Sequence, residues 1–210
     1  MKKLLLILLL VGSLFAGNLE KGLEAAQQGD FQTALRLWKI EAQKGDPEAQ
    51  HNLGFMYYNG QGVQQDYKEA AKWWLNAAKQ GISQAQYNLG IMYEHGQGVQ
   101  QDYKEAAKWY TLAAKQGYPQ AQYNIGLMYY NGQGVQQDYK EAEKWWLNAA
   151  EQGYPKAQHK LGFIYVMGQG VPMDKIKAYQ WWLKAAKQGN TNAQKNLDIL
   201  CKQSPWACQK

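Results

Sequence analysis

The sequence predicts an all-α solenoid, built from short helix hairpins that stack one after another, and a constant period is the first reason. The segment Gly-Gln-Gly-Val begins at Gly60, Gly96, Gly132 and Gly168, a step of 36 residues each time. The pair Ala-Gln starts at Ala49 and returns with the same step as far as Ala193. A fixed period between about 20 and 50 residues is typical of stacked supersecondary units, none of which buries its apolar face alone.

Helix start and stop signals within one period are the second reason. Asp46 suits an N-cap that is followed by proline at the first helical position, so a first helix is expected over about residues 47–59. Loop glycines accept the positive φ that ends a helix. Asp66 then caps a second helix that stops at Gly81, and Glu69 is placed to reach back as in a capping box.

Aromatic residues that keep the period are the third reason. Residues fixed to a period are packing residues far more often than ligand residues, so we expect one tryptophan position in the core: Trp38, Trp74, Trp146 and Trp182. The position before it is expected to be partly exposed, at Trp73, Trp109, Trp145 and Trp181.

The pattern Ala-x-x-x-Leu-Gly-x-x-Tyr-x-x-Gly-x-Gly-Val-x-x-Asp-x-x-x-Ala-x-x-Trp-x-x-x-Ala-Ala-x-x-Gly resembles the Sel1-like repeat, a relative of the tetratricopeptide repeat with a longer loop between its helices. It is met at residues 49–81, 85–117 and 121–153, and with an altered loop at 157–189. The resemblance implies a right-handed superhelical solenoid of stacked helix-turn-helix repeats.

The remaining segments give the expected domain organisation. Four repeats fill residues 49–192, and residues 17–48 are a degenerate N-terminal repeat whose loop is about four residues shorter. Residues 193–210 are a C-terminal capping helix and tail, because Asp198 replaces the expected glycine and no partner helix follows.

Residues 1–16 have the order of a secretory signal peptide, with Lys2 and Lys3 before an apolar run from Leu4 to Phe15. That run is shorter than the roughly 20 residues of a spanning helix. We therefore expect export to the bacterial periplasm or the cell exterior, with no membrane insertion after cleavage. In that compartment Cys201 and Cys208 are expected to form a disulfide, with two unpaired thiols as the alternative.

Charge and chemistry exclude several functions. Without Lys2 and Lys3 the chain carries 21 basic and 17 acidic residues, and the signs alternate along the second helices, which does not favour a nucleic-acid partner. Ser83 and Ser204 begin no Ser-x-x-Lys, and the three histidines form no zinc-binding pair. No catalytic residue, metal site or cofactor is indicated. Some Sel1-like repeat proteins carry a β-lactamase or penicillin-binding label, so the resemblance leaves such a hydrolase as the alternative.

The resemblance to tetratricopeptide repeats implies that the first helix of each hairpin lines a concave face. The partner-binding residues expected there are Asn52, Phe55, Tyr58, Tyr87, Asn88, Ile91, Tyr123, Asn124, Leu127, Tyr130, Lys160 and Phe163. Asn52, Asn88 and Asn124 form a regular series of amides that suits a peptide backbone, although asparagine is also common filler at this position. Varied aromatic residues around them are typical interface anchors. The sequence thus predicts a monomeric, non-enzymatic protein–protein interaction scaffold with a polypeptide partner.

Cleavage of the signal peptide is the first testable expectation. N-terminal sequencing of the exported protein should begin near Gly17, because small residues follow the apolar run at Ala16 and Gly17. Exported protein that still carries Met1 would contradict the predicted compartment.

Overall fold

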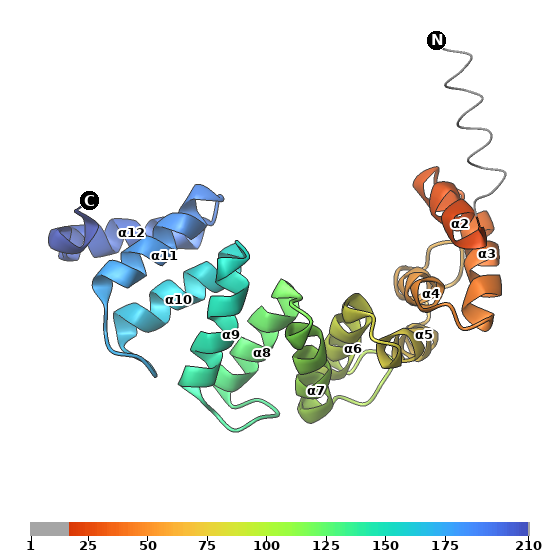
Figure 1. The fold of residues 1–210 in the computed structure, drawn as a ribbon, viewed down its shortest axis with the longest axis horizontal. Coiled ribbons are helices and arrows are strands. Elements are labelled where there is room, and N and C mark those ends of the chain that lie inside the picture. The colour runs from red at the N-terminus through yellow and green to blue at the C-terminus, as the bar shows by residue number, and fades with distance from the viewer. Residues whose placement is uncertain (1–16, 210) are drawn as a thin grey trace, which may run out of the picture. The chain divides into compact units, whose positions relative to one another are not determined.

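The computed structural model describes residues 17–209, and within that range the chain folds into α-helices without a strand (Figure 1). The signal peptide predicted for residues 1–16 lies outside the described residues. The first five helices are α2 (Asn18–Gln27), α3 (Phe31–Gln43), α4 (Pro47–Asn59), α5 (Tyr67–Lys79) and α6 (Ser83–His95). They are followed by α7 (Tyr103–Lys115), α8 (Pro119–Asn131), α9 (Tyr139–Glu151), α10 (Pro155–Met167), α11 (Lys175–Lys187), α12 (Thr191–Gln203) and a 3₁₀ turn, η1 (Pro205–Cys208). The predicted all-α repeat solenoid is confirmed.

The chain divides into two compact units, an N-terminal unit that ends at Gln101 and a C-terminal unit that begins at Asp102. In the N-terminal unit α2 pairs with α3 and α4 with α5, and α3 also packs on α4 and α5 on α6. In the C-terminal unit the pairs are α8 with α9 and α10 with α11. Within each unit, a second helix therefore packs on the first helix of its own hairpin, on that of the next hairpin, or on both.

In four hairpins of the described residues, an indole that rests on a helical glycine holds the two helices together. Trp74 of α5 is 3% exposed, and its Nε1 donates a hydrogen bond of 3.1 Å to the carbonyl oxygen of His51 in α4. A Cβ atom on Gly54 would overlap the same indole, which explains the glycine in the middle of a helix. The same trio recurs as Trp38 with Gly22 and Leu19, Trp146 with Gly126 and Tyr123, and Trp182 with Gly162 and His159.

The loop of each full repeat joins its hairpin to the one before. Gly60 ends α4 with φ of 68°, as the positive-φ expectation requires. The second loop glycine, Gly62, also has positive φ, and a Cβ there would meet the carbonyl oxygen of Phe31 at 2.6 Å. Gly98, Gly134 and Gly170 lie in the same way against Tyr67, Tyr103 and Tyr139. Only glycine combines this conformation with so close an approach.

Buried glutamines add polar cross-links at the same junctions. Gln50 is 6% exposed, and its Nε2 donates to the carbonyl oxygen of Ala42 in the preceding hairpin at 3.2 Å. Its Oε1 accepts from Gln80 at 2.8 Å. Gln122 and Gln158 repeat both bonds in the C-terminal unit. The periodic Ala-Gln pair is thus structural, since a buried amide without partners would be costly.

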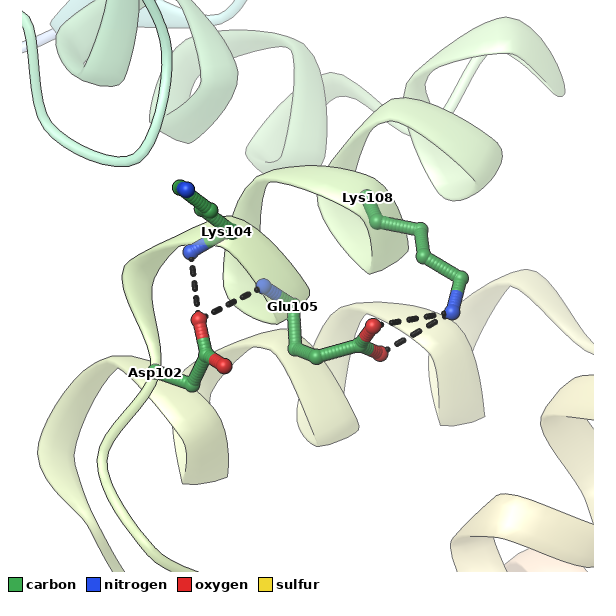
Figure 2. A network of polar contacts seen from close by, with 4 residues as sticks. All are labelled: Asp102, Lys104, Glu105 and Lys108. Carbon is green, nitrogen blue, oxygen red and sulfur yellow. Dashed lines mark hydrogen bonds and ion pairs between the residues drawn. The ribbon is translucent and has the colours of Figure 1, made fainter.

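The aspartate caps form as predicted, but the reciprocal glutamate bond does not. Asp102 Oδ1 accepts from the backbone nitrogens of Lys104 and Glu105 at 2.8 and 3.1 Å, while the Glu105 carboxylate pairs with Lys108 at 3.0 Å (Figure 2). The capping box expected for Glu69 is therefore wrong. Glu69 pairs with Lys72 instead, because the Asp66 N–H already donates to the carbonyl oxygen of Tyr57 at 2.9 Å.

Tryptophans at the second periodic position differ among themselves. Trp73, Trp145 and Trp181 are half-buried, as expected. Trp109 is only 6% exposed, so the expectation of partial exposure was wrong there. At this repeat the neighbouring core position holds Tyr110 in place of tryptophan.

The C-terminal tail closes the end of α12. Cys201 and Cys208 form the predicted disulfide, with Cα atoms 5.6 Å apart. The bond holds η1 against α11 and α12, where Ala207 is buried and Ser204 accepts a hydrogen bond of 2.8 Å from Lys175 Nζ. Among the described residues, no helix combines the length and apolar character that crossing a membrane requires.

Removal of a core indole should destabilise the fold whether or not a binding partner is present. We expect Trp74→Ala or Trp146→Ala to lower the free energy of unfolding by about 3–5 kcal/mol, as large-to-small core substitutions do. Chemical denaturation measures the change. Trp206→Ala is the control, because Trp206 is 57% exposed and its loss should cost no more than about 0.5 kcal/mol. Equal losses for core and control would contradict the assigned packing.

Candidate functional site

Four of the predicted binding residues line one cleft in the N-terminal unit. Phe55 and Tyr58 come from α4, and Asn88 and Ile91 from α6. Together with Asn59 and Trp74 they enclose about 120 Å³, and we name this space the α4–α6 cleft. Phe55 is 49% exposed at its edge. The structure thus gathers an amide, a phenol and two apolar side chains around a shallow opening.

A second and larger cleft lies one hairpin earlier in the same unit. The α2–α4 cleft encloses about 340 Å³ and is lined by Ala26, Gln27, Phe31, Trp38, Asn52, Phe55, Met56 and Gln61. Asn52 and Phe55 were predicted, whereas Ala26, Gln27, Phe31 and Gln61 were missed. They were missed because the expected positions were those of the full repeats. The first helix of the degenerate repeat, α2, is offset from α4 by 32 residues rather than 36, as the equivalent carbonyl acceptors Leu19 and His51 show.

In the C-terminal unit the predicted residues Tyr130 and Lys160 come together. The Tyr130 ring lies 5.1 Å from that of Tyr139 and 5.5 Å from that of Trp146. Lys160 Nζ lies 5.9 Å from the ring centres of both Tyr130 and Trp146, a cation–π arrangement. Burial lowers the pKa of the Lys160 ammonium.

The other predicted residues of this unit lie along the same first helices. Tyr123 contacts the ring of Tyr154 edge-on at 5.6 Å, and burial raises its pKa. Leu127 and Phe163 are half-buried and pack on the core. In the N-terminal unit Tyr87 of α6 is half-buried as well.

The predicted series of amides differs from one repeat to the next. Asn52 hydrogen-bonds to His51, whereas the half-buried side chains of Asn88 and Asn124 have no hydrogen bond within residues 17–209. Lys160 takes the place of the fourth amide, and Asn196 at the fifth place lies 3.0 Å from His159 Nε2. Asn88 and Asn124 are therefore the two amides that retain their full capacity to donate and accept.

The serines do not form an accessible nucleophilic site. Ser83 Oγ donates to the neighbouring Gln84 at 3.1 Å. Ser204 contacts Lys175 Nζ, but Ser204 is 2% exposed and lines neither of the two clefts. Within the described range no group of three or more histidine, cysteine, aspartate or glutamate side chains could hold a metal ion.

Stacked hairpins of this length, with a glycine under each core indole and a Gly-x-Gly loop, define an α-helical repeat protein of the tetratricopeptide-like class. The Sel1 repeat family matches residues 47–82, 83–118, 119–154 and 155–190. The chain belongs to the Sel1 repeat family, a fold that commonly serves as a protein-interaction scaffold.

Solved structures show the same fold. The chain is 39% identical to a protective antigen present in uropathogenic Escherichia coli strains, with a TM-score of 0.83, over 86% of this chain and 39% of that protein. It therefore spans well under half the length of that relative. A Sel1 repeat protein from Oxalobacter formigenes is 35% identical with a TM-score of 0.83, over 87% of this chain and 75% of that one.

More distant structures share the fold alone. A Sel1 repeat protein from Klebsiella pneumoniae is 21% identical, with a TM-score of 0.53 over 87% of this chain and 91% of that one. No curated protein sequence matches the chain.

Burial of two histidines predicts a pH dependence of stability. Desolvation lowers the pKa of His51 and of His159 below the ordinary value of 6.5. Because the unfolded chain then binds more protons, stability should be full above about pH 6.5 and fall as the pH drops through the lowered values. His51→Tyr, which installs the residue found at Tyr87 and Tyr123, should reduce the loss between pH 7 and pH 5 in thermal melts. Exposed His95→Tyr is the control, and an equal effect of both would contradict the assignment.

Proposed function

We propose that this protein is a non-catalytic scaffold that binds a polypeptide partner through the exposed faces of its first helices. In the N-terminal unit the surface centres on the α4–α6 cleft, and in the C-terminal unit on the side chains around Tyr130 and Asn124. The α4–α6 cleft carries the proposal, because it sets the unpartnered amide of Asn88 beside the half-exposed ring of Phe55.

The chemistry of that cleft suits an extended chain. A free side-chain amide both donates and accepts, as the backbone of a bound peptide requires. An exposed aromatic ring beside it offers the apolar contact area from which interfaces draw most of their affinity. The volume of about 120 Å³ lies below the roughly 300 Å³ at which small-molecule pockets begin, which favours a side chain over a whole ligand.

Two further observations support the proposal. The family's fold commonly serves protein interaction. The disulfide fits a protein that works outside the reducing cytoplasm, so the partner is expected in the periplasm or outside the cell. The hydrolase alternative lacks support, since its best-placed serine, Ser204, is buried.

Partner capture with amide variants tests the proposal. A periplasmic polypeptide captured by cross-linking should bind Asn88→Ala and Asn124→Ala more weakly by about 1 kcal/mol each, roughly fivefold in Kd, as a lost hydrogen bond predicts. Isothermal calorimetry measures the change, and unfolding stability should barely alter because both side chains lack intramolecular bonds. Asn148→Ala is the matched control, an exposed asparagine on the second helix α9.

The opposite result would place the surface elsewhere. Should both amide variants bind normally while Trp73→Ala on α5 abolishes binding, the partner contacts the second helices. The fold would stand, but the residues proposed here would be wrong.

A further inference from the structure

The two clefts of the N-terminal unit are equivalent positions of successive hairpins, yet they differ almost threefold in volume. Trp38 corresponds to Trp74, and Phe55 of the α2–α4 cleft corresponds to Ile91 of the α4–α6 cleft, each pair 36 residues apart. For α2 the offset to α4 is 32 residues, because Leu19 and Gly22 meet Trp38 as His51 and Gly54 meet Trp74. The exposed fractions of the side chains agree with this offset, because Leu23 is 51% exposed and its counterpart Phe55 is 49% exposed.

By this offset Ala26 stands where the next repeat has Tyr58. Tyr58 fills its own site with three contacts. Its ring lies 5.1 Å from that of Tyr67 and 5.3 Å from that of Trp74, and its hydroxyl donates to Gln97 Oε1 at 3.1 Å.

Tyr130 makes the same three contacts in the C-terminal unit. Its ring lies 5.1 Å from Tyr139 and 5.5 Å from Trp146, at interplanar angles within one degree of those around Tyr58. Its hydroxyl donates to Gln169 Oε1 at 2.7 Å. Two independent copies thus show that this position of the repeat accommodates a phenol.

The α2–α4 cleft retains the partners of that phenol without the phenol itself. Phe31 corresponds to Tyr67, Trp38 to Trp74 and Gln61 to Gln97, and all three line the cleft. The Gln61 side chain has no hydrogen bond within the described residues, so its amide is available. Trp38 lines the opening although most of its ring is buried. The cleft lined by Ala26 encloses about 340 Å³, against about 120 Å³ for the cleft lined by Tyr58.

We propose that the α2–α4 cleft is a socket for a tyrosine side chain of the bound polypeptide, whose ring packs on Phe31 and Trp38 and whose hydroxyl donates to Gln61. This deepens the function proposed above and rests on it, since the tyrosine is supplied by the polypeptide partner. Asn52 and Gln27 at the rim then face the backbone on either side of the inserted residue. Aromatic side chains lodged in pockets are the usual anchors of such interfaces.

Titration of the full-length protein with p-cresol, the side-chain analogue of tyrosine, tests the socket directly. In ¹H–¹⁵N NMR spectra the indole resonance of Trp38 should shift with saturation in the millimolar range, as for a ligand of so few atoms. Gln61→Leu should weaken p-cresol binding about three- to tenfold and leave toluene binding unchanged. No shift at Trp38, or equal losses for both probes, would overturn the proposal.

Substitutions at Ala26 and at its counterpart Tyr58 should remove the p-cresol site from one cleft and create one in the other. Ala26→Tyr introduces the tyrosine found at Tyr58 and Tyr130 and should abolish the p-cresol shift at Trp38. Leu23→Tyr, which adds a tyrosine at an exposed neighbour, should leave the shift intact. If Ala26→Tyr fails to fold, Tyr58→Ala still decides, since it should create a second p-cresol site reported by Trp74. Binding unaffected by Tyr58→Ala would contradict the socket.

The same variants separate this inference from the proposed function. A captured partner should bind Ala26→Tyr at least tenfold more weakly than wild type. A partner that depends on Asn88 but tolerates Ala26→Tyr would sustain the scaffold and reject the socket. A partner that is weakened by Ala26→Tyr but tolerates Asn88→Ala would sustain the socket and reject the α4–α6 cleft as the binding surface. A Trp38 resonance that moves on dilution would assign the socket to a second copy of the chain and would overturn the partner assignment.

Discussion

Contact between an indole and a helical glycine is the constraint on which four of the hairpins depend. The bond from Trp74 Nε1 to the carbonyl oxygen of His51 fixes α5 at one height along α4, and Gly54 sets how closely the two helices approach. Because the position of α5 along α4 is fixed, the loop that joins these helices spans a fixed distance. Gly62 in that loop therefore contacts the preceding hairpin at Phe31. The constant spacing of glycines and tryptophans in the sequence follows from this geometry. Removal of Trp74 would therefore remove this positional constraint as well as buried area.

The same rigidity explains how a small change in sequence becomes a surface feature. Because Trp38 and Trp74 hold their hairpins in the same register, the positions around them superimpose from one repeat to the next. Ala26 in place of tyrosine removes a ring from this arrangement, in which Phe31 and Phe55 also replace Tyr67 and Ile91, and the surroundings of such a space relax only in part. Phe31, Trp38 and Gln61 line the opening that results.

The sequence specified the fold more fully than the candidate site. Local sequence signals that recur from repeat to repeat predict the helix limits, such as residues 47–59. They also predict the aspartate caps and the buried tryptophans. Glu69 departed from its expected role because its target N–H bonds to Tyr57 through the path of the loop, which no local pattern encodes. Trp109 is buried where its repeat carries Tyr110, a substitution whose effect depends on neighbours in space. Of the candidate site, Phe55 and Asn88 were predicted by position, but the α2–α4 cleft was not. The expected positions came from the four full repeats alone, and the contacts of Leu19 and Gly22 confirm the shorter offset of the first hairpin.

The first and the last elements of the described residues are stabilised in different ways. At the C-terminal end the disulfide draws η1 over α12, burying Ala207 and satisfying Ser204 with Lys175. At the N-terminal end the shortened hairpin leaves the α2–α4 cleft open, with Phe31 and an amide from Gln61 at its wall. A single tyrosine at position 26, already used twice in this chain, would fill that opening from within. Since the stabilising residue is so readily available, the open cleft is better explained by a partner that supplies the ring than by a failure to complete the repeat.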